Sequence, residues 1–166
     1  MWSMKNKNLL FLFLCVMIFT LTGCGQKLYE PQLPENYTLF NDFGFQSKQV
    51  EEDGCSAFEY NGRTYYFYSY CRNLYEDEVN KSLGRLVFGG EEDSYVIVSL
   101  SYDDSDDYLV NLYEGPELMA PPNEVYRAID TRDKDIDAPS FIDAPQYSEE
   151  EKCGDRMAQY WLNGKE

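Results

Sequence analysis

Apolar and polar residues alternate through much of the chain between residues 37 and 130, and this pattern predicts short β-strands. The clearest example is SAFEYNGRTYYFYSY at 56–70, in which Asn61-Gly62 separates two runs rich in aromatic residues. Asn-Gly is the preferred pair for a two-residue type I′ turn, because both of its positions need positive φ. The segment therefore predicts a β-hairpin in which Phe58 pairs with Tyr65.

Further strands are predicted wherever β-branched and aromatic residues gather between turn signals. They are YTLFNDFGF at 37–45, RLVF at 85–88, YVIVSLSY at 95–102, YLVNLYE at 108–114 and NEVYRAID at 123–130. The stretch NLYEDEVNKSLG at 73–84 has a different pattern, and it predicts a short helix that Gly84 ends.

The spacing of apolar residues changes near the C-terminus, where it becomes helical. Ser148 and Glu151 form an S-x-x-E capping box, which satisfies backbone amides at the start of a helix. One face of the following segment then carries Cys153, Met157, Tyr160 and Trp161. Together with the strands, a helix over about 148–162 predicts an α+β fold: a small antiparallel β-sheet or barrel with a C-terminal amphipathic helix packed on it.

The N-terminus holds the longest apolar run in the sequence. It covers thirteen residues from Leu9 to Leu21, it has no charge, and it follows Lys5 and Lys7. A helix needs about 20 apolar residues to span a bilayer, so this run is too short for a membrane-spanning helix. A short apolar run behind a basic start is typical of a secretory signal peptide.

The four residues Leu21-Thr22-Gly23-Cys24 end this run, and they resemble the lipobox of bacterial lipoproteins. The resemblance implies that the Cys24 thiol carries a diacylglycerol and that cleavage leaves Cys24 as the N-terminus. The chain then divides into a signal peptide at 1–23, a lipidated N-terminus and tether at 24–36, and one β-rich extracytoplasmic domain at 37–166. The alternative is an uncleaved anchor or ordinary secretion with a free Cys24.

Charge limits the partners of this domain. The chain of 166 residues carries 14 Lys and Arg against 30 Asp and Glu, for a net charge of −16, which argues against binding to nucleic acid or to an anionic membrane surface. Lipid attached at Cys24 would then be the contact with the bilayer. The 15 Tyr and 10 Phe supply enough apolar area for a folded domain.

The sequence contains no histidine, which excludes Ser-His-Asp and Cys-His catalysis as well as histidine zinc sites. An enzyme would have to use a carboxylate pair, a lysine-assisted nucleophile or a carboxylate-bound cation. A pair of carboxylates at a suitable distance is expected by chance among so many acids, so it identifies no catalytic residue. No cofactor is predicted either.

Three cysteines remain after Cys24. Outside the cytoplasm a disulfide is permitted, and Cys55 and Cys71 flank the predicted turn on opposite arms of the hairpin. A regular hairpin does not place these two opposite each other, so a bridge between them would require a bulge. The alternative is that all three cysteines are buried thiols, with Cys153 on the apolar face of the helix.

Acidic residues suggest a second candidate site. Asp133, Asp135 and Asp137 follow the spacing of the first three ligands of an EF-hand loop. The pattern then departs from that loop, since Ala138 stands in place of the turn glycine and Ala144 in place of the bidentate glutamate. The acidic run at 103–107 has charge density without a ligand pattern. A solvated acidic surface explains both segments equally well.

Exposed aromatic rings are a third candidate, because they stack on sugars and peptides. Tyr65 and Phe67 lie on one face of the second hairpin strand and Tyr66, Tyr68 and Tyr70 on the other, so one row should be buried and the other row is a candidate patch. Short motifs (FEYNGRTYY, SLGRL and NEVYRAID) are also similar to small Firmicute-type lipoproteins of unassigned function. That resemblance implies a β-rich fold and no activity.

These features favour a lipid-anchored, non-catalytic domain that binds an envelope protein or glycan at the extracytoplasmic face of the cell membrane. The alternatives are a carboxylate- or cation-dependent enzyme, for example one acting on wall glycans, and a calcium-binding module.

Overall fold

Strands are the main regular secondary structure in the part of the chain that the structure describes. The computed structural model describes residues 25–44, 55–88, 90–92, 95–114, 122–145 and 152–162, with only the backbone described for Phe88 and for 152–156. Within these parts the elements are β1 (Thr38–Asn41), β2 (Ala57–Tyr60), β3 (Arg63–Cys71), β4 (Val79–Phe88), β5 (Glu91–Glu92), β6 (Tyr95–Leu100), β7 (Tyr108–Tyr113), β8 (Asn123–Ala128), the 3-10 turn η2 (Ile129–Thr131) and the helix α2 (Lys152–Leu162).

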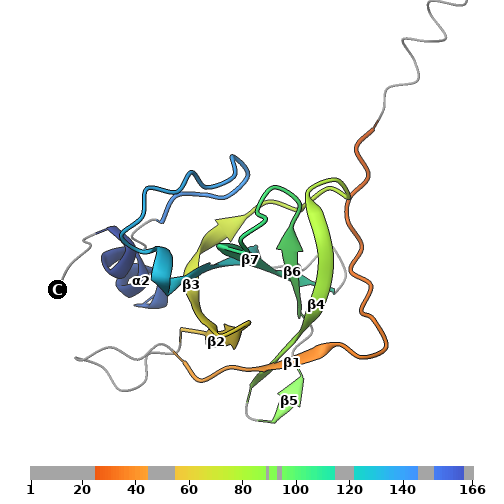
Figure 1. Ribbon diagram of the computed structural model, residues 1–166, viewed down its shortest axis with the longest axis horizontal. Coiled ribbons are helices and arrows are strands. Elements are labelled where there is room, and N and C mark those ends of the chain that lie inside the picture. The colour runs from red at the N-terminus through yellow and green to blue at the C-terminus, as the bar shows by residue number, and fades with distance from the viewer. Residues whose placement is uncertain are drawn as a thin grey trace, which may run out of the picture.

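The strands form one sheet that curls into a nearly closed barrel (Figure 1). Its strand order is β1-β4-β6-β7-β8-β3-β2, with β5 paired to β4. Every pair is antiparallel except β1 with β4, which is parallel. The predicted β-barrel with a C-terminal helix is therefore correct in outline, although one strand pair is parallel and the helix is short.

The β2–β3 hairpin is the element that the sequence predicted in most detail. Asn61 has φ 49° and Gly62 has φ 74°, as a type I′ turn requires. The register pairs Phe58 with Tyr65, which confirms the predicted alignment.

The predicted helix at 73–84 is wrong, because Val79–Phe88 is strand β4. Gly84 lies inside that strand and pairs with Thr38 of β1. A Cβ atom at residue 84 would lie 1.8 Å from the carbonyl oxygen of Thr38. The glycine therefore permits a close approach between two backbones and does not end a helix.

The barrel closes between β1 and β2 through a few bonds made by irregular backbone. The Phe43 amide donates to the Ala57 carbonyl at 2.9 Å, and the Ala57 amide donates to the Asp42 carboxylate at 2.9 Å. Inside the barrel, the rings of Phe40 and Phe58 have their centroids 5.4 Å apart. The packing of these two rings thus joins β1 to β2, which are not paired by a regular ladder of hydrogen bonds.

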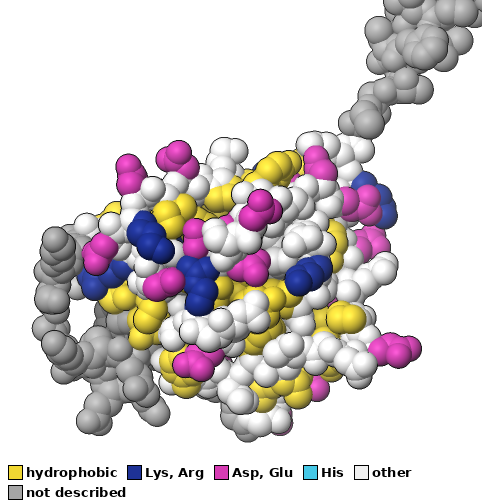
Figure 2. Space-filling view, viewed as in Figure 1, with side chains coloured by type: hydrophobic (Ala, Val, Ile, Leu, Met, Phe, Trp, Pro, Cys, Tyr) yellow, Lys and Arg dark blue, Asp and Glu magenta, His cyan; other side chains and the backbone are white. Residues whose placement is uncertain are grey.

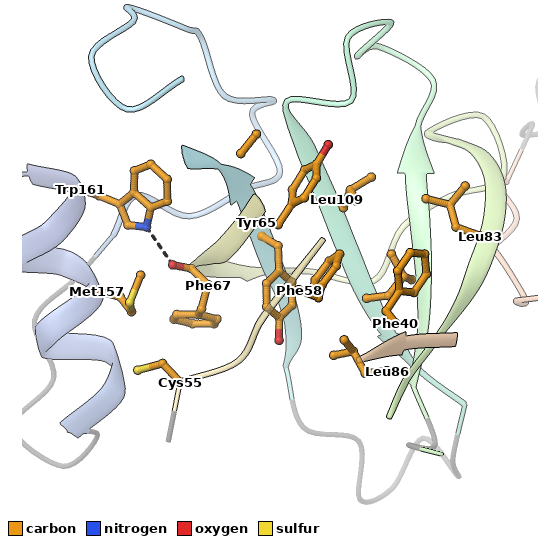
Figure 3. Close-up of a cluster of buried hydrophobic side chains, with 13 residues drawn as sticks. Phe40, Cys55, Phe58, Tyr65, Phe67, Leu83, Leu86, Leu109, Met157 and Trp161 are labelled. Atoms are coloured by element: carbon orange, nitrogen blue, oxygen red, sulfur yellow. Dashed lines mark hydrogen bonds between the residues drawn. The ribbon is translucent and has the colours of Figure 1, made fainter. Parts of the chain in front are cut away.

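We call the cluster inside the barrel the barrel core (Figure 3). Its buried members are Phe40, Cys55, Phe58, Tyr65, Phe67, Leu83, Leu86, Ile97, Leu109, Tyr126, Ala128, Met157 and Trp161. Met157 and Trp161 come from α2, and the Trp161 indole donates to the Phe67 carbonyl at 2.8 Å. The predicted helix start at 148–151 and the Cys153 side chain lie outside the described residues.

A second cluster, the outer core, lies on the opposite face of the sheet. Its buried members are Cys71, Leu74, Val79, Val96, Val98, Leu100, Tyr108, Val110, Leu112, Val125, Phe141 and Ile142. Partly buried side chains from two irregular segments, among them Tyr29, Leu33 and Ile136, pack against it. Loops and extended chain therefore cover this face.

Arg127 of β8 ties one of these covering segments to the sheet. It is 8% exposed, and its guanidinium donates to the backbone carbonyls of Thr131 at 2.7 Å and Lys134 at 3.1 Å. The same group lies 5.3 Å from the Trp161 ring centroid and 5.5 Å from that of Tyr108. A buried cation is thus stabilised by carbonyls and ring faces.

Candidate ligand-binding site

An open pocket of about 390 Å³ lies over the outer face of the sheet. Four parts of the chain form it: the N-terminal segment, the β3–β4 connection, the end of β7 and the start of β8. The residues that line it are Leu28, Tyr29, Glu30, Pro31, Asn73, Leu74, Leu112, Tyr113, Glu114 and Asn123. These residues include apolar, aromatic, amide and carboxylate side chains, a mixture that is common in small-molecule sites.

The N-terminal segment makes one wall of the pocket because its backbone is bonded to the β3–β4 connection. The Tyr29 amide donates to the Leu74 carbonyl at 2.8 Å, and the Glu76 amide donates to the Lys27 carbonyl at 2.9 Å. The hydroxyls of Tyr29 and Ser82 are hydrogen-bonded at 2.8 Å. The prediction that residues 24–36 form a tether is therefore wrong for the part that begins at Lys27, which lies on the domain.

The floor of the pocket is apolar and is continuous with the outer core. Leu74 and Leu112 are both buried there. Beside them, the Asn123 side-chain amide donates to the Arg72 carbonyl at 3.3 Å and to the Asn73 side chain at 3.2 Å. Its side-chain oxygen accepts the Tyr113 amide at 3.4 Å. Asn123 therefore holds three chain segments together at the rim.

The charged groups of the pocket are both carboxylates. Glu114 is ion-paired with Arg85. Glu30 is exposed, and it has no ion-pair partner within the described part of the chain. Tyr29 and Tyr113 add aromatic rings. This set of groups favours a ligand that offers N–H or O–H donors or a positive charge, and it disfavours an anion.

The predicted lipidation site, Cys24, lies outside the described residues. The predicted bridge between Cys55 and Cys71 is wrong, because Cys55 is disulfide-bonded whereas Cys71 is a free, buried thiol. Cys55 belongs to the barrel core and Cys71 to the outer core, so the sheet separates them. Burial raises the pKa of the Cys71 thiol to about 12, which makes it unreactive at neutral pH.

The candidate calcium ligands Asp133, Asp135 and Asp137 are all exposed, in the segment that follows η2. No group of three or more Asp, Glu, Cys or His side chains in the described residues is arranged to hold a metal ion. The structure thus brings none of these three aspartates into a cluster with other candidate ligands.

The acidic run at 103–107 is a folded loop that one arginine holds. The Arg63 guanidinium donates to the Ser105 carbonyl at 2.6 Å and forms ion pairs with Asp107 and Asp130, each at 2.7 Å. The Tyr108 amide donates to the Asp103 carboxylate at 2.6 Å. Basic side chains also lie directly beside acidic ones on the face shown in Figure 2. Asp103 and Asp107 of this acidic run thus have a structural role in the loop.

The predicted aromatic patch is absent from the described surface of β3. Tyr66, Tyr68 and Tyr70 are only partly exposed, and all three pack against the barrel core. Tyr66 contacts Tyr160 of α2, and a register shift between Phe67 and Ser69 brings Tyr70 against the Phe67 ring. This second aromatic row is partly covered because α2 packs against it and because the strand bulges between Phe67 and Ser69.

The pocket residues themselves were not predicted from the sequence. They come from four segments that are far apart in the chain, and no local pattern joins them.

The chain matches no protein-family model, and no curated protein or solved structure is significantly similar to it. Among the described residues, no helix is both long enough and apolar enough to cross a bilayer.

Proposed function

We propose that this chain is a lipid-anchored, non-catalytic binding domain on the extracytoplasmic face of the cell membrane. The basic start, the short apolar run and Leu21-Thr22-Gly23-Cys24 support the anchor. The observation that carries the binding role is the pocket, because it combines an apolar floor with the exposed Glu30 carboxylate and the exposed Asn73 amide at its rim.

The composition of the pocket also indicates what kind of partner it suits. Leu74 and Leu112 offer a floor for an apolar group, and Glu30 and Asn73 offer acceptors at the rim. A small molecule, or a projecting side chain or sugar of an envelope protein or glycan, would fit a space of about 390 Å³.

The anchor is tested by replacing the modified cysteine in the full chain. Cys24→Ala should abolish incorporation of labelled fatty acid, because the thiol that carries the lipid is gone. Cys15→Ala is the matched control, since it removes a thiol from the apolar run and should leave labelling unchanged. Equal labelling of Cys24→Ala and the natural chain would overturn the anchor.

The binding role is tested by filling the pocket. Asn73→Trp places a bulky ring at the rim, whereas Asn80→Trp adds the same ring at an exposed position of β4 outside the pocket. Calorimetric titrations with wall glycans and envelope peptides, with and without millimolar calcium, should show binding that Asn73→Trp abolishes and Asn80→Trp retains. Binding unaffected by both variants would contradict the pocket, and release of a reaction product would instead favour an enzyme.

A further inference from the structure

The docked N-terminal segment sets how close the domain lies to the anchor. Only Gly25 and Gln26 separate Cys24 from Lys27, whose carbonyl is bonded to Glu76. A fully extended chain spans at most ~3.3–3.6 Å per residue, so the Cα atoms of Cys24 and Lys27 lie within about 11 Å of each other. An acylated Cys24 therefore leaves almost no free tether.

The same constraint orients the domain. Figure 1 shows the N-terminal segment running along the outer side of the barrel beside β4, with α2 on the opposite side. Residues 28–31, which directly follow Lys27, make one wall of the pocket. An anchor this short brings the side of the barrel that carries the pocket wall toward the bilayer and keeps α2 away from it.

The side chains on this side of the barrel suit a lipid headgroup that carries one negative and one positive charge. Lys27 is exposed, and its ion pair with Glu76 at 2.8 Å is on the surface, where such pairs contribute little to stability. It is therefore available to a phosphate. Glu30, three residues further on, supplies a carboxylate for an ammonium group, and Tyr29 contributes an aromatic side chain to the same pocket.

From this placement we propose that the pocket opens at the membrane surface and binds the zwitterionic headgroup of a membrane lipid whose ammonium group carries N–H donors. The proposal rests on the lipid anchor and the binding pocket proposed above. A zwitterionic headgroup fits better than an anionic one, because a chain with a net charge of −16 is repelled by an anionic surface.

The orientation is tested with the full-length lipoprotein, purified from membranes and reconstituted in phosphatidylcholine vesicles. An environment-sensitive dye is attached at Asn73→Cys on the pocket rim or at Leu162→Cys on α2, both at exposed positions. Cys71 is buried and will not compete for the dye. Lipids with spin labels near the headgroup should quench the dye at 73 at least about twofold more strongly than the dye at 162. Equal or reversed quenching would overturn the orientation.

The ligand is tested with the dye moved to Asp77→Cys, an exposed position of the β3–β4 connection outside the pocket lining, in vesicles of three compositions. Replacing part of the phosphatidylcholine by phosphatidylethanolamine, whose ammonium has N–H donors, should shift the emission, whereas phosphatidylglycerol should not. Glu30→Gln should abolish the shift, and the matched variant Glu35→Gln, at an exposed position of the same segment outside the pocket, should keep it. A shift that survives Glu30→Gln, or one produced equally by phosphatidylglycerol, would overturn the proposal.

Two further readings separate a failure of this inference from a failure of the proposed function. Mass spectrometry of the N-terminal peptide shows whether Cys24 is acylated; if it is not, the anchor and the orientation both fail. If Cys24 is acylated and soluble glycerophosphoethanolamine binds while the vesicle lipid gives no shift, the binding pocket stands and the membrane source of its ligand is wrong.

Discussion

The barrel core and the outer core use neighbouring residues of the same strands, but different kinds of structure enclose them. On β7, for example, Leu109 faces the barrel core and Val110 faces the outer core. The barrel core is enclosed mainly by the sheet, whose neighbouring strands are bonded along ladders except between β1 and β2, and α2 adds Met157 and Trp161. The outer core is covered by irregular chain that a few backbone bonds hold, such as Tyr29 to Leu74 and Glu76 to Lys27.

This difference has consequences for stability and for binding. Regular ladders over a closed cluster should open only with global unfolding, whereas a layer held by a few bonds should open locally at a lower free energy. The candidate pocket lies in that outer layer. Binding residues are commonly carried by irregular segments on a rigid scaffold, and the barrel supplies the scaffold here. The predictions below test this contrast.

The largest effect is expected where two backbones of the barrel meet. Gly84→Ala would place a Cβ 1.8 Å from the Thr38 carbonyl oxygen, so β1 would have to move away from β4. We expect the free energy of unfolding to fall by at least about 3 kcal/mol in denaturant titrations. Gly25→Ala is the control, because nothing lies within 4 Å of a Cβ at that position. An unchanged unfolding midpoint for Gly84→Ala would mean that β1 does not lie on β4.

The disulfide of Cys55 should stabilise the barrel side of the molecule. Cys71 is free. If Cys15 is removed with the signal peptide and Cys24 is acylated, Cys153 is the cysteine that remains, and we expect it to be the partner. Reduction should lower the free energy of unfolding by about 2 to 4 kcal/mol. Reductant should still act on Cys71→Ala and should have no effect on Cys55→Ala. Peptide mapping that linked Cys55 to any other cysteine would contradict the assignment.

The hairpin turn offers a smaller effect within the barrel. Gly62 has φ 74°, where a β-branched residue is strained. Gly62→Val should therefore cost about 1 to 3 kcal/mol in thermal or denaturant unfolding. Asn61→Gly is the control, since glycine accepts the positive φ of that position. A Gly62→Val domain as stable as the natural one would show that the turn does not set the register of β2 and β3.

Sequence patterns predicted the barrel better than its covering layer, and the reason is physical. The period-two pattern and the Asn61-Gly62 pair act over a few residues, so they identify strands and the hairpin directly. Gly84 was misread as a helix end because its role is to admit β1, which lies more than forty residues away along the chain. A local pattern of apolar and polar residues does not show that two strands distant in the sequence approach each other closely.

The pocket was missed for a related reason. Residues 25–36 have no periodic pattern, and their two prolines read as a tether. Only the folded structure shows that Tyr29 reaches Ser82 and that Leu28 lies against Tyr75. The sequence predicted that one of the two aromatic rows of β3 is buried, and Tyr65 and Phe67 are indeed buried. It did not predict that α2 packs against Tyr66 of the other row, because that contact is tertiary.

In the outer layer, Glu78 should make stability depend on pH. The Arg72 guanidinium donates twice to the Glu78 carboxylate, at 2.6 and 2.9 Å, and this lowers the pKa of Glu78; the Tyr75 amide adds a third bond. Because the folded-state pKa is lowered, the stabilisation is complete above the ordinary value near 4.5 and is lost as the pH falls through the lowered value.

Glu78→Gln should therefore cost about 1.5 kcal/mol at neutral pH, a value kept modest because Arg72 is partly exposed. The difference from the natural chain should shrink as the pH falls below about 4.5, since protonated Glu78 then resembles glutamine. Asp77→Asn, at an exposed neighbouring position, should show no such convergence. A difference that stayed constant between roughly pH 3 and pH 7 would show that the ion pair does not hold the layer.

The substitution with the smallest expected effect tests most directly whether the outer layer opens independently of the barrel core. Tyr29→Phe keeps the ring against the outer core but removes the hydroxyl bonded to Ser82, at an expected cost of about 1 kcal/mol. That cost should be confined to the docked N-terminal segment, because the barrel core contains no atom of Tyr29. In hydrogen exchange, the amides of Tyr29 and Glu76 should exchange faster, whereas the amides of the β2–β3 hairpin should be unchanged. Tyr37→Phe, which removes a hydroxyl bonded to Glu92 on the surface, is the matched control and should leave the Tyr29 and Glu76 amides protected. Faster exchange throughout the barrel would show that the two cores open as one unit, and the pocket would then belong to the scaffold and not to a layer docked on it.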